Sequence, residues 1–286
     1  MRYAAIERIP RPVPIGRRCH LLDVSRSGYY AWRTRGPSRR TQGDGQLVVA
    51  MRRIHADVDR SYGSPRMHRE LVGEGVACGR HRVARVMRAA GIRAKQARRF
   101  RTTTDSRHAF AIAPNRLGRD FTAAAPNQVW MGDMTYIPTG TGWCYLAVLL
   151  DAFSRRVVGW AVGTQLTAAL PLAALETAVR TRRPPAGLLH HSDRGVQYAC
   201  ETYQRAVRAH GLDGSMSRRG NCWDNAVVES FFHSLKVERL HERRFTGVED
   251  VTAEVEDYIE RFYNRHRRHS TLGYLSPVIY ELRHAA

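Results

Sequence analysis

The chain has 286 residues with 43% hydrophobic content, which is ordinary for a globular protein and allows two modest domains or one large one. No apolar run approaches the ~20 residues that span a bilayer, and the amino terminus lacks the apolar stretch of a signal peptide. The five cysteines are scattered without a Cys-x-x-Cys pair. This argues against a disulfide framework or a zinc site and favours a reduced, cytoplasmic setting with no membrane partner.

The net charge of +20 is unevenly placed along the chain. Residues 1–119 carry 27 Arg and Lys against 8 Asp and Glu, whereas residues 120–286 carry 19 against 18. Because 44 of the 46 basic residues are Arg, a general compositional bias is an alternative explanation. Such a bias should act on both parts equally. The asymmetry therefore predicts that the first part binds a polyanion, and double-stranded DNA is the expected partner.

The amino-terminal region is expected to be helical. Residues 17–35 predict a short helical pair, with Ser25 as the candidate cap of the second helix. Gly, Pro and Ser at residues 36–43 indicate a linker. Apolar residues at helical spacing over residues 45–59 predict an amphipathic helix.

A helix-turn-helix is expected next. The first helix should run from Ser64 to Leu71, since Pro is well placed in a first turn, and the second from Gly79 to Ala90. The second helix has apolar positions that should face a core: Val83, Val86 and Met87. Its arginines should face outward and contact DNA as a recognition helix does: Arg80, Arg82, Arg85 and Arg88. A solvated helical face is the alternative.

The pattern changes to a mixed α/β sheet after a basic linker of little regular structure. The expected strands cover residues 129–137, 143–150, 156–162, 187–191 and 212–216. The expected helices cover residues 168–182, 203–210, 224–240 and 248–265. The resulting division is a basic helical segment (1–43), a helix-turn-helix-like DNA-binding domain (44–93), a basic linker (94–125) and a catalytic core with a helical extension (126–286).

Three acids occupy informative positions in the second part. Asp133 and Asp193 are 60 positions apart, and Glu229 follows after 35 intervening residues. Both aspartates lie on apolar runs that predict strands, and Glu229 lies on a predicted helix. Each acid alone could be a solvated residue, but a carboxylate among buried residues needs a metal or a cation. Together they predict a carboxylate site for paired Mg²⁺ ions, with positions open to phosphate oxygens and water.

Two other acids are alternative candidates for the metal-binding set. Asp224 precedes Glu229 by five positions, about 140° around a helix, so the two cannot share a face. Asp224 is better placed as the N-cap of that helix. Asp151 follows an apolar run, and we interpret it as part of a hairpin turn.

Several basic residues near the acids could also be functional. Lys236 lies two helical turns after Glu229 and is one of only two lysines in the chain, with Lys95. A solvated Lys is the alternative. Arg267 and Arg268 belong to a basic, aromatic end that could contact a DNA backbone, although packing of Tyr263 against the core is equally compatible.

Histidines do not predict a zinc site here. No cysteine pairs with them at zinc-finger spacing, and two of them are adjacent, so their side chains should point to opposite faces of a strand. The histidines concerned are His190, His191, His266 and His269.

Three motifs identify a family resemblance. They are His191-Ser192-Asp193-Arg194-Gly195-Val196-Gln197-Tyr198, then Asn221-Cys222-Trp223-Asp224-Asn225-Ala226 leading to Glu229-Ser230-Phe231-Phe232, then Tyr263-Asn264 through Gly273-Tyr274-Leu275-Ser276-Pro277. With the Asp, Asp and Glu spacing, they resemble bacterial insertion-sequence transposases of the IS-three type, specifically the product of the downstream reading frame. The resemblance runs from about Cys19 to Pro277.

This resemblance implies a fold and an activity. The fold would be a ribonuclease-H-like mixed sheet, with a retroviral-integrase-like DDE core, preceded by an all-α helix-turn-helix region. Asp133, Asp193 and Glu229 would hold two Mg²⁺ (or Mn²⁺) ions per active site. The enzyme would cleave DNA and transfer strands at the ends of its own insertion sequence by phosphodiester hydrolysis and transesterification. The position of Lys236 holds a residue that contacts the DNA end in integrase-like enzymes.

The resemblance also implies partners. These are the terminal inverted repeats and target DNA, further copies of the chain on DNA, and an upstream-frame product joined by frameshifting. A location at the bacterial nucleoid follows. Two alternatives remain: a metal-dependent nuclease of the same fold, and a DNA-binding regulator with an inactive catalytic domain.

Overall fold

The computed structural model describes residues 2–9, 12–96, 110–218 and 222–284. The chain forms two compact units, Met1–Arg52 and Arg53–Ala286, and the boundary between them falls inside helix α4 (Arg39–Asp57). Among the described residues, no helix is both long enough and apolar enough to cross a bilayer.

The first unit is a small helical cluster. It contains α1 (Arg2–Arg8), α2 (Ile15–Leu21), α3 (Arg26–Thr34) and the beginning of α4. Its hydrophobic cluster consists of Ile6, Cys19 and Tyr29. The expected cap is confirmed, because Ser25 Oγ accepts a hydrogen bond from the Gly28 amide at 3.0 Å.

Two features of the first unit differ from expectation. Helix α1 was not predicted. The linker expected over residues 36–43 is shorter, since α4 begins at Arg39. The Ser38 hydroxyl accepts a hydrogen bond from the Thr41 amide at 3.2 Å, which stabilises the start of this helix.

The helix pair that follows agrees with the predicted helix-turn-helix within a few residues. It comprises α5 (Ser64–Gly73) and α6 (Arg80–Ala89). The three expected core positions of α6 are buried together with Met67 and Leu71 of α5. Three of the four outward arginines are exposed and Arg82 is half-buried.

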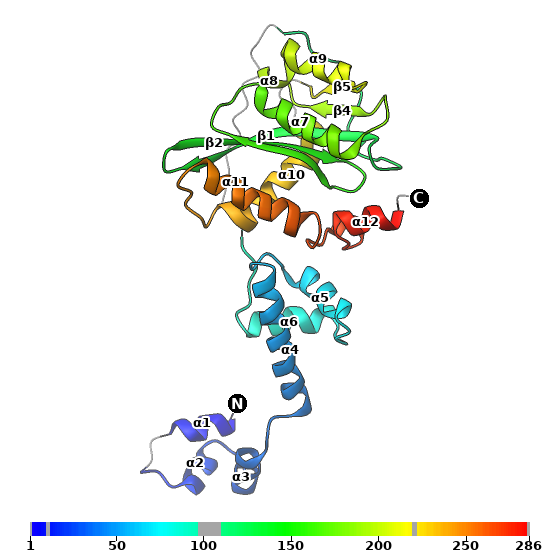
Figure 1. Cartoon of the computed structure of the whole chain (residues 1–286). Helices are drawn as coiled ribbons and strands as arrows, with labels where there is room; N and C mark the ends of the chain where they lie inside the picture. The colour runs from blue at the N-terminus through cyan, green and yellow to red at the C-terminus, as the bar shows by residue number, and fades with distance from the viewer. Residues whose placement is uncertain (1, 10–11, 97–109, 219–221, 285–286) are drawn as a thin grey trace. The chain divides into compact units, whose positions relative to one another are not determined.

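A five-stranded mixed sheet forms the centre of the second unit (Figure 1). Its strands are β1 (Val129–Thr139), β2 (Gly142–Asp151), β3 (Val157–Gly163), β4 (Leu189–Ser192) and β5 (Asp213–Met216). The order is β3-β2-β1-β4-β5. Strands β1 to β3 are antiparallel, whereas β4 and β5 run parallel to β1. Every end of the five strands lies within two residues of the predicted position.

Helices cover both faces of the sheet (Figure 1). One face carries α7 (Ala169–Arg182), α8 (Val196–Ala199) and α9 (Glu201–Ala209), and the other carries α10 (Ala226–Leu235) and α11 (Val248–Glu256). Helix α7 approaches β3 closely at Gly159, where an added Cβ would lie 2.2 Å from the Ala174 carbonyl oxygen. A side chain at this position would therefore displace the helix.

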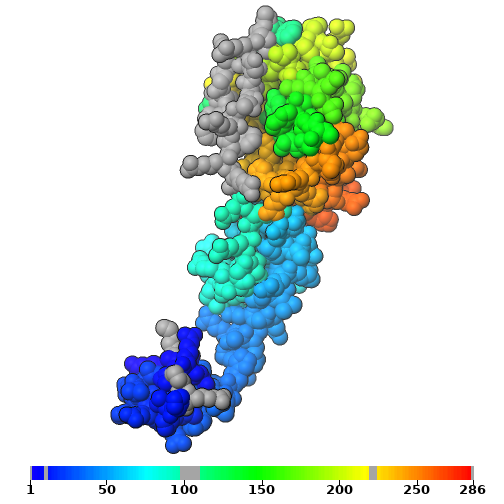
Figure 2. All heavy atoms as spheres, turned by 90° about the vertical axis from the view of Figure 1, so that its left-hand side faces the viewer, coloured from blue at the N-terminus to red at the C-terminus, as the bar shows by residue number. Residues whose placement is uncertain are grey.

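The helical extension is less regular than predicted. Helix α10 continues as the π-helix η2 (Lys236–Leu240), and α11 continues as the π-helix η3 (Asp257–Tyr263). The chain ends with η4 (Ser270–Leu272) and α12 (Pro277–His284). Figure 2 shows the orange atoms of the extension packed against the green atoms of the sheet strands.

The extension is anchored to the core by aromatic packing. The ring of Tyr263 lies edge-to-face on Phe231 of α10, with centroids 4.8 Å apart. Packing of Tyr263 against the catalytic core, one of the two possibilities considered for it, is therefore confirmed.

Part of the expected linker is fixed to the core. Within residues 110–128 there is no helix or strand, as predicted, but Leu117 is buried and the Arg116 amide donates to Ser215 Oγ of β5 at 3.0 Å. Lys95 is also held, because its ammonium donates to Asp59 and to the Glu238 carbonyl oxygen, each at 2.7 Å. The idea of a free tether is corrected for these residues, while residues 97–109 lie outside the described part of the chain.

Candidate active site

Asp133 and Asp193 are brought together by the register of two parallel strands. The ladder between β1 and β4 ends with Gly132 opposite Ser192, and the two aspartates are the next residues. Each carboxylate accepts a backbone hydrogen bond at 2.8 Å, Asp133 from the Met134 amide and Asp193 from the Gly195 amide. These bonds fix the orientation of both side chains.

Glu229 reaches the same region from α10. The side-chain amide of Asn225, immediately before the helix, donates to the Gly132 carbonyl oxygen at 3.2 Å. This bond attaches the start of α10 to β1 next to Asp133. Glu229 follows one turn later on the same face of the helix as Asn225.

The electrostatics of Asp133 reflect its acidic neighbours. Burial raises the pKa of Asp133 well above its ordinary range, and the negative charges of Asp193 and Glu229 raise it further. The Met134 amide and the ammonium of Lys236 act in the opposite direction. Burial also raises the pKa of Glu229 and lowers the pKa of Lys236. The charges of Asp193, Glu229 and Lys236 therefore all act on Asp133.

The three carboxylates lie near one another, but they do not surround a position that a metal ion could occupy. Within the described ranges, no three His, Cys, Asp or Glu side chains are arranged to hold a metal ion. The site is therefore a cluster of acids around the end of the β1–β4 ladder, and a bound cation would have to draw its side chains together.

The role expected for Asp224 as an N-cap is wrong. Asp224 is buried in the short helix η1 (Cys222–Asn225), and α10 has no side-chain cap bond. Its carboxylate instead accepts hydrogen bonds from Arg218 at 2.8 Å and from Arg119 at 2.9 Å. The bonds from Arg218 are the main reason that the pKa of Asp224 lies far below its ordinary range. Asp224 holds the segment before α10 in place by ion pairing.

Asp151 is a structural residue, as interpreted from the sequence. It is buried at the end of β2, and its carboxylate accepts the amides of Asn127 at 2.7 Å and Phe153 at 2.9 Å. Burial is the main reason that the pKa of Asp151 is raised. The residue closes the turn between β2 and β3 and takes no part in the acidic cluster.

The strand histidines are committed to internal hydrogen bonds. His190 Nε2 lies 2.8 Å from the Tyr203 hydroxyl, whereas His191 Nδ1 lies 2.9 Å from Ser215 Oγ. Burial lowers the pKa of both rings to about 4, so both are neutral at neutral pH. Of the other two, His266 is exposed and His269 is buried against Tyr263.

Arg267 and Arg268 are engaged inside the protein. Arg267 is buried, and its guanidinium donates two hydrogen bonds to the Glu238 carboxylate at 2.6 and 2.7 Å. Arg268 pairs with Glu70 of α5 and donates to the Tyr274 carbonyl oxygen at 3.1 Å. The expected contact with DNA is corrected for Arg267, which stabilises the extension instead. Sequence reasoning missed Glu238, whose pairing depends on contact between η2 and the segment that follows η3.

Comparison with known proteins relates two parts of the chain to known families. Two family models described as "Integrase core domain" match residues 123–222 and 210–277, and a model described as "HTH-like domain" matches residues 43–100. The chain is also similar to the solved HTLV-2 integrase catalytic core domain in complex with magnesium (trimeric form), at 16% identity and a TM-score of 0.44. That match covers 56% of this chain and 99% of the other. The matched models and the mixed sheet define an integrase-core protein with an added helix-turn-helix-like module.

Curated relatives narrow the class to a family. The chain is 45% identical over 262 residues to the insertion element IS600 uncharacterized 31 kDa protein of Shigella sonnei, covering 92% of this chain and 96% of the relative. It is 42% identical over 292 aligned positions to transposase InsF for insertion sequence IS3A of Escherichia coli (strain K12), covering both chains completely. The chain belongs to the insertion-sequence transposases of the IS3 type.

Proposed function

We propose that this chain is a DDE transposase that cleaves DNA and transfers strands at the ends of its own insertion sequence. The observation that carries the proposal is the placement of Asp133 and Asp193 at one level of two adjacent parallel strands. Glu229 comes from a helix attached to the same strand. Family membership supports the choice of reaction, since the full-length relative is named a transposase.

The acidic cluster fits a divalent cation. Burial raises the pKa of Asp133 most, and the negative charges of Asp193 and Glu229 raise it further. A hard cation with oxygen ligands would compensate them, and Mg²⁺ or Mn²⁺ suits an all-carboxylate donor set. We propose that Asp133, Asp193 and Glu229 hold two such ions. When bound, the ions would supply Lewis-acid stabilisation at phosphorus and lower the pKa of an attacking water or hydroxyl.

The residues of the chain would position the substrate. The backbone bonds of Met134 and Gly195 hold the two aspartates in fixed orientations, which favours in-line attack at one phosphodiester. Lys236, half-buried beside Asp133, would bind a phosphate of the DNA end. Hydrolysis would leave a 3′-hydroxyl, and attack of that hydroxyl on target DNA would join the strands without a covalent enzyme intermediate.

The helix-turn-helix module would supply much of the DNA affinity. Arg80, Arg85 and Arg88 are exposed on α6, and Arg82 is half-buried there. We propose that these residues bind terminal-repeat DNA as a recognition helix. We also propose that several copies act together on DNA, that an upstream-frame product is joined to this chain, and that the protein works at the nucleoid.

A cleavage and joining assay tests this function. The full chain is incubated with a duplex of the element's end and a target plasmid, in Mg²⁺, Ca²⁺ or excess chelator. We expect cleavage and joining in Mg²⁺, and binding with little chemistry in Ca²⁺. Cleavage without joining would indicate a nuclease, and binding without either would indicate a regulator. Full activity in chelator would contradict the proposed chemistry.

A further inference from the structure

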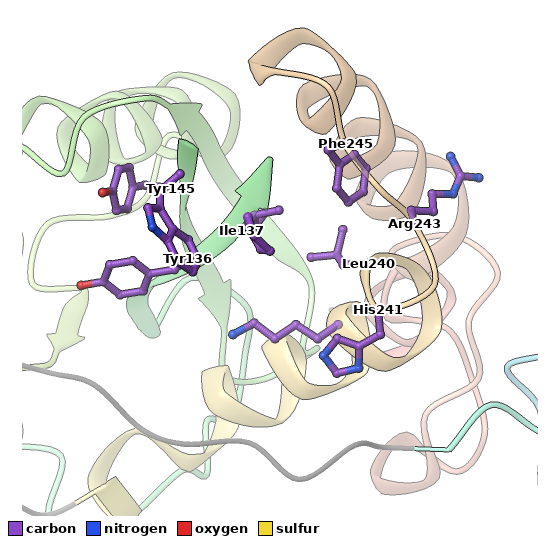
Figure 3. A pocket seen from close by; sticks show the side chains of 10 residues that line it. Tyr136, Ile137, Tyr145, Leu240, His241, Arg243 and Phe245 are labelled. Atoms are coloured by element: carbon purple, nitrogen blue, oxygen red, sulfur yellow. The ribbon is translucent and has the colours of Figure 1, made fainter. Parts of the chain in front are cut away.

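A cavity of about 650 Å³ lies beside the acidic cluster (Figure 3). It is lined by residues of β1 beyond the stretch that pairs with β4. Strand β4 pairs with β1 only as far as Gly132, and further along β1 an isolated β-bridge joins Thr139 to Phe245. Lys236 lines one end of the cavity, and its positive charge lowers the pKa of Asp133. The cavity therefore starts beside the proposed catalytic acids and extends away from them.

One wall of the cavity is aromatic. It is formed by the β1–β2 hairpin, which contributes Tyr136, Trp143 and Tyr145. The ring of Tyr136 lies edge-on to both other rings, with centroids 6.3 Å from Trp143 and 5.2 Å from Tyr145. Trp143 is 56% exposed and Tyr136 is 38% exposed. Large aromatic surface of this kind, gathered at a cavity, is typical of a binding site.

The opposite wall carries apolar and basic side chains. Figure 3 shows Leu240, His241, Arg243 and Phe245 across the cavity from Tyr136 and Tyr145, with Ile137 between them. Arg243 forms an ion pair with Glu254, and Figure 3 shows its guanidinium pointing away from the cavity. The positive group that lines the cavity beside the acids is therefore Lys236.

These features suit one kind of occupant. We propose that the cavity takes a single unstacked nucleobase from the DNA end, next to the phosphodiester that reacts. A nucleobase has a flat face for the aromatic wall and a flanking phosphate for Lys236. An apolar peptide or lipid chain would use the aromatic rings but not the cation. The volume lies within the ~300–1,000 Å³ of small-ligand sites, which accommodates one nucleotide and excludes a duplex.

Extraction of one base would also assist the chemistry. A base removed from the stack bends and opens the DNA end, so its phosphodiester can approach acids that lie at the edge of a sheet. The inference rests on the proposed function, because it assumes that the acids act on a DNA end. Trp143 then acts as a substrate-binding residue.

Photo-crosslinking tests the site. The full chain is mixed in Ca²⁺ with duplexes of the element's end that carry 5-iodouracil at one of the last few positions, and crosslinked peptides are identified by mass spectrometry. We expect crosslinks to the β1–β2 hairpin, at Tyr136 or Trp143. Trp143→Ala should lower their yield about tenfold or more, whereas Trp143→Phe should retain most of it. Leu282→Ala is the control, because Leu282 is 75% exposed and lies outside the cavity.

Two outcomes would overturn the inference. Crosslinks of the terminal bases could map only outside the hairpin, or Trp143→Ala could leave the yield unchanged. An unchanged yield together with a lower sedimentation mass of the DNA-free chain would make this face an interface between copies. Cleavage in Mg²⁺ is measured on the same duplexes. Normal cleavage without the crosslink refutes the base site alone, whereas the crosslink without cleavage refutes the proposed function alone.

Discussion

Asp133 and Asp193 lie one residue beyond the last paired positions of two adjacent parallel strands. Their separation of 60 positions equals the register offset between the strands, since Val129 pairs with Leu189 and Gly132 with Ser192. Neighbouring strands lie ~4.8 Å apart, so carboxylates at one level are held near each other by the backbone itself. The sheet thereby creates an acidic pair whose repulsion a cation would relieve.

The first prediction concerns how much this acidic pair lowers the stability of the fold. A carboxyl with a raised pKa binds more protons in the folded state than in the unfolded state, so it lowers stability as pH rises from about 4 through the raised value. Asp133→Asn removes this penalty. We expect the variant to melt at a higher temperature than the parent chain in chelator, with a gap that widens between pH 4 and pH 8. A difference in melting temperature that does not depend on pH would contradict the claim that the charge of Asp133 destabilises the fold.

The control for this measurement is Asp213→Asn. Asp213 is half exposed on β5 and pairs with Arg116 at 3.2 Å, away from the acidic cluster. Surface pairs of this kind contribute about 0–1 kcal/mol, so the change should alter melting little at any pH.

The second prediction contrasts the two lysines of the chain. Lys236→Ala should lower strand joining strongly and stability little, because Lys236 is half-buried beside the acids and a positive charge there would bind the DNA end. Lys95→Ala should do the reverse. Lys95 is 6% exposed and bonds to Asp59 and Glu238, so we expect a loss of about 1–3 kcal/mol with normal joining per folded molecule. Thermal melting and joining assays on both variants decide this, and an exchange of the two phenotypes would refute it.

The third prediction concerns Asp224. Asp224→Asn leaves Arg119 and Arg218 without their carboxylate, and we expect a loss of about 1–2 kcal/mol, since both arginines are partly solvated. The pKa of Asp224 is depressed, so this stabilisation is complete above about pH 4 and disappears as pH falls through the depressed value. Urea unfolding at pH 7 measures it, and an unchanged free energy of unfolding would exclude the ion-pair role.

The fourth prediction concerns the recognition helix. Replacement of Arg80, Arg85 and Arg88 by Ala in the full chain should weaken binding to the end duplex and reduce the slope of log affinity against log salt by about 3, if each contacts one phosphate. Arg205→Ala, an exposed arginine on α9, is the control and should change neither. A slope unaffected by the triple change would remove α6 from the DNA interface.

Much of this structure could be predicted from the sequence, because strands and helices leave a periodic pattern of apolar residues along the chain. The apolar runs predict all five strands, and the acid spacing predicts which strands bring carboxylates together. The failures involve tertiary ion pairs that periodicity does not record. Asp224 is paired with Arg218, six positions away across a loop, and with Arg119, 105 positions away. Arg267, which follows η3, is paired with Glu238 of η2, 29 positions away.

The π-helices show a different limit. Apolar periodicity predicts one continuous helix through residue 240 and another through residue 265, since it does not distinguish an α-turn from a π-turn. The Tyr258 hydroxyl of η3 donates to the Glu238 carboxylate of η2 at 2.8 Å. A contact of this kind between two helices is a tertiary interaction, which periodicity along the chain does not record.

The central claim is that three carboxylates form one catalytic site, and strand transfer by amide variants tests it most directly. Joining of the element's end duplex to target DNA in Mg²⁺ is measured for Asp133→Asn, Asp193→Asn and Glu229→Gln, with Asp213→Asn as control and gel shifts to monitor binding. We predict that each of the three loses joining by on the order of a thousandfold, about 4 kcal/mol, while binding is nearly intact and the control is active. Joining near the parental rate by any one of the three would contradict the assignment.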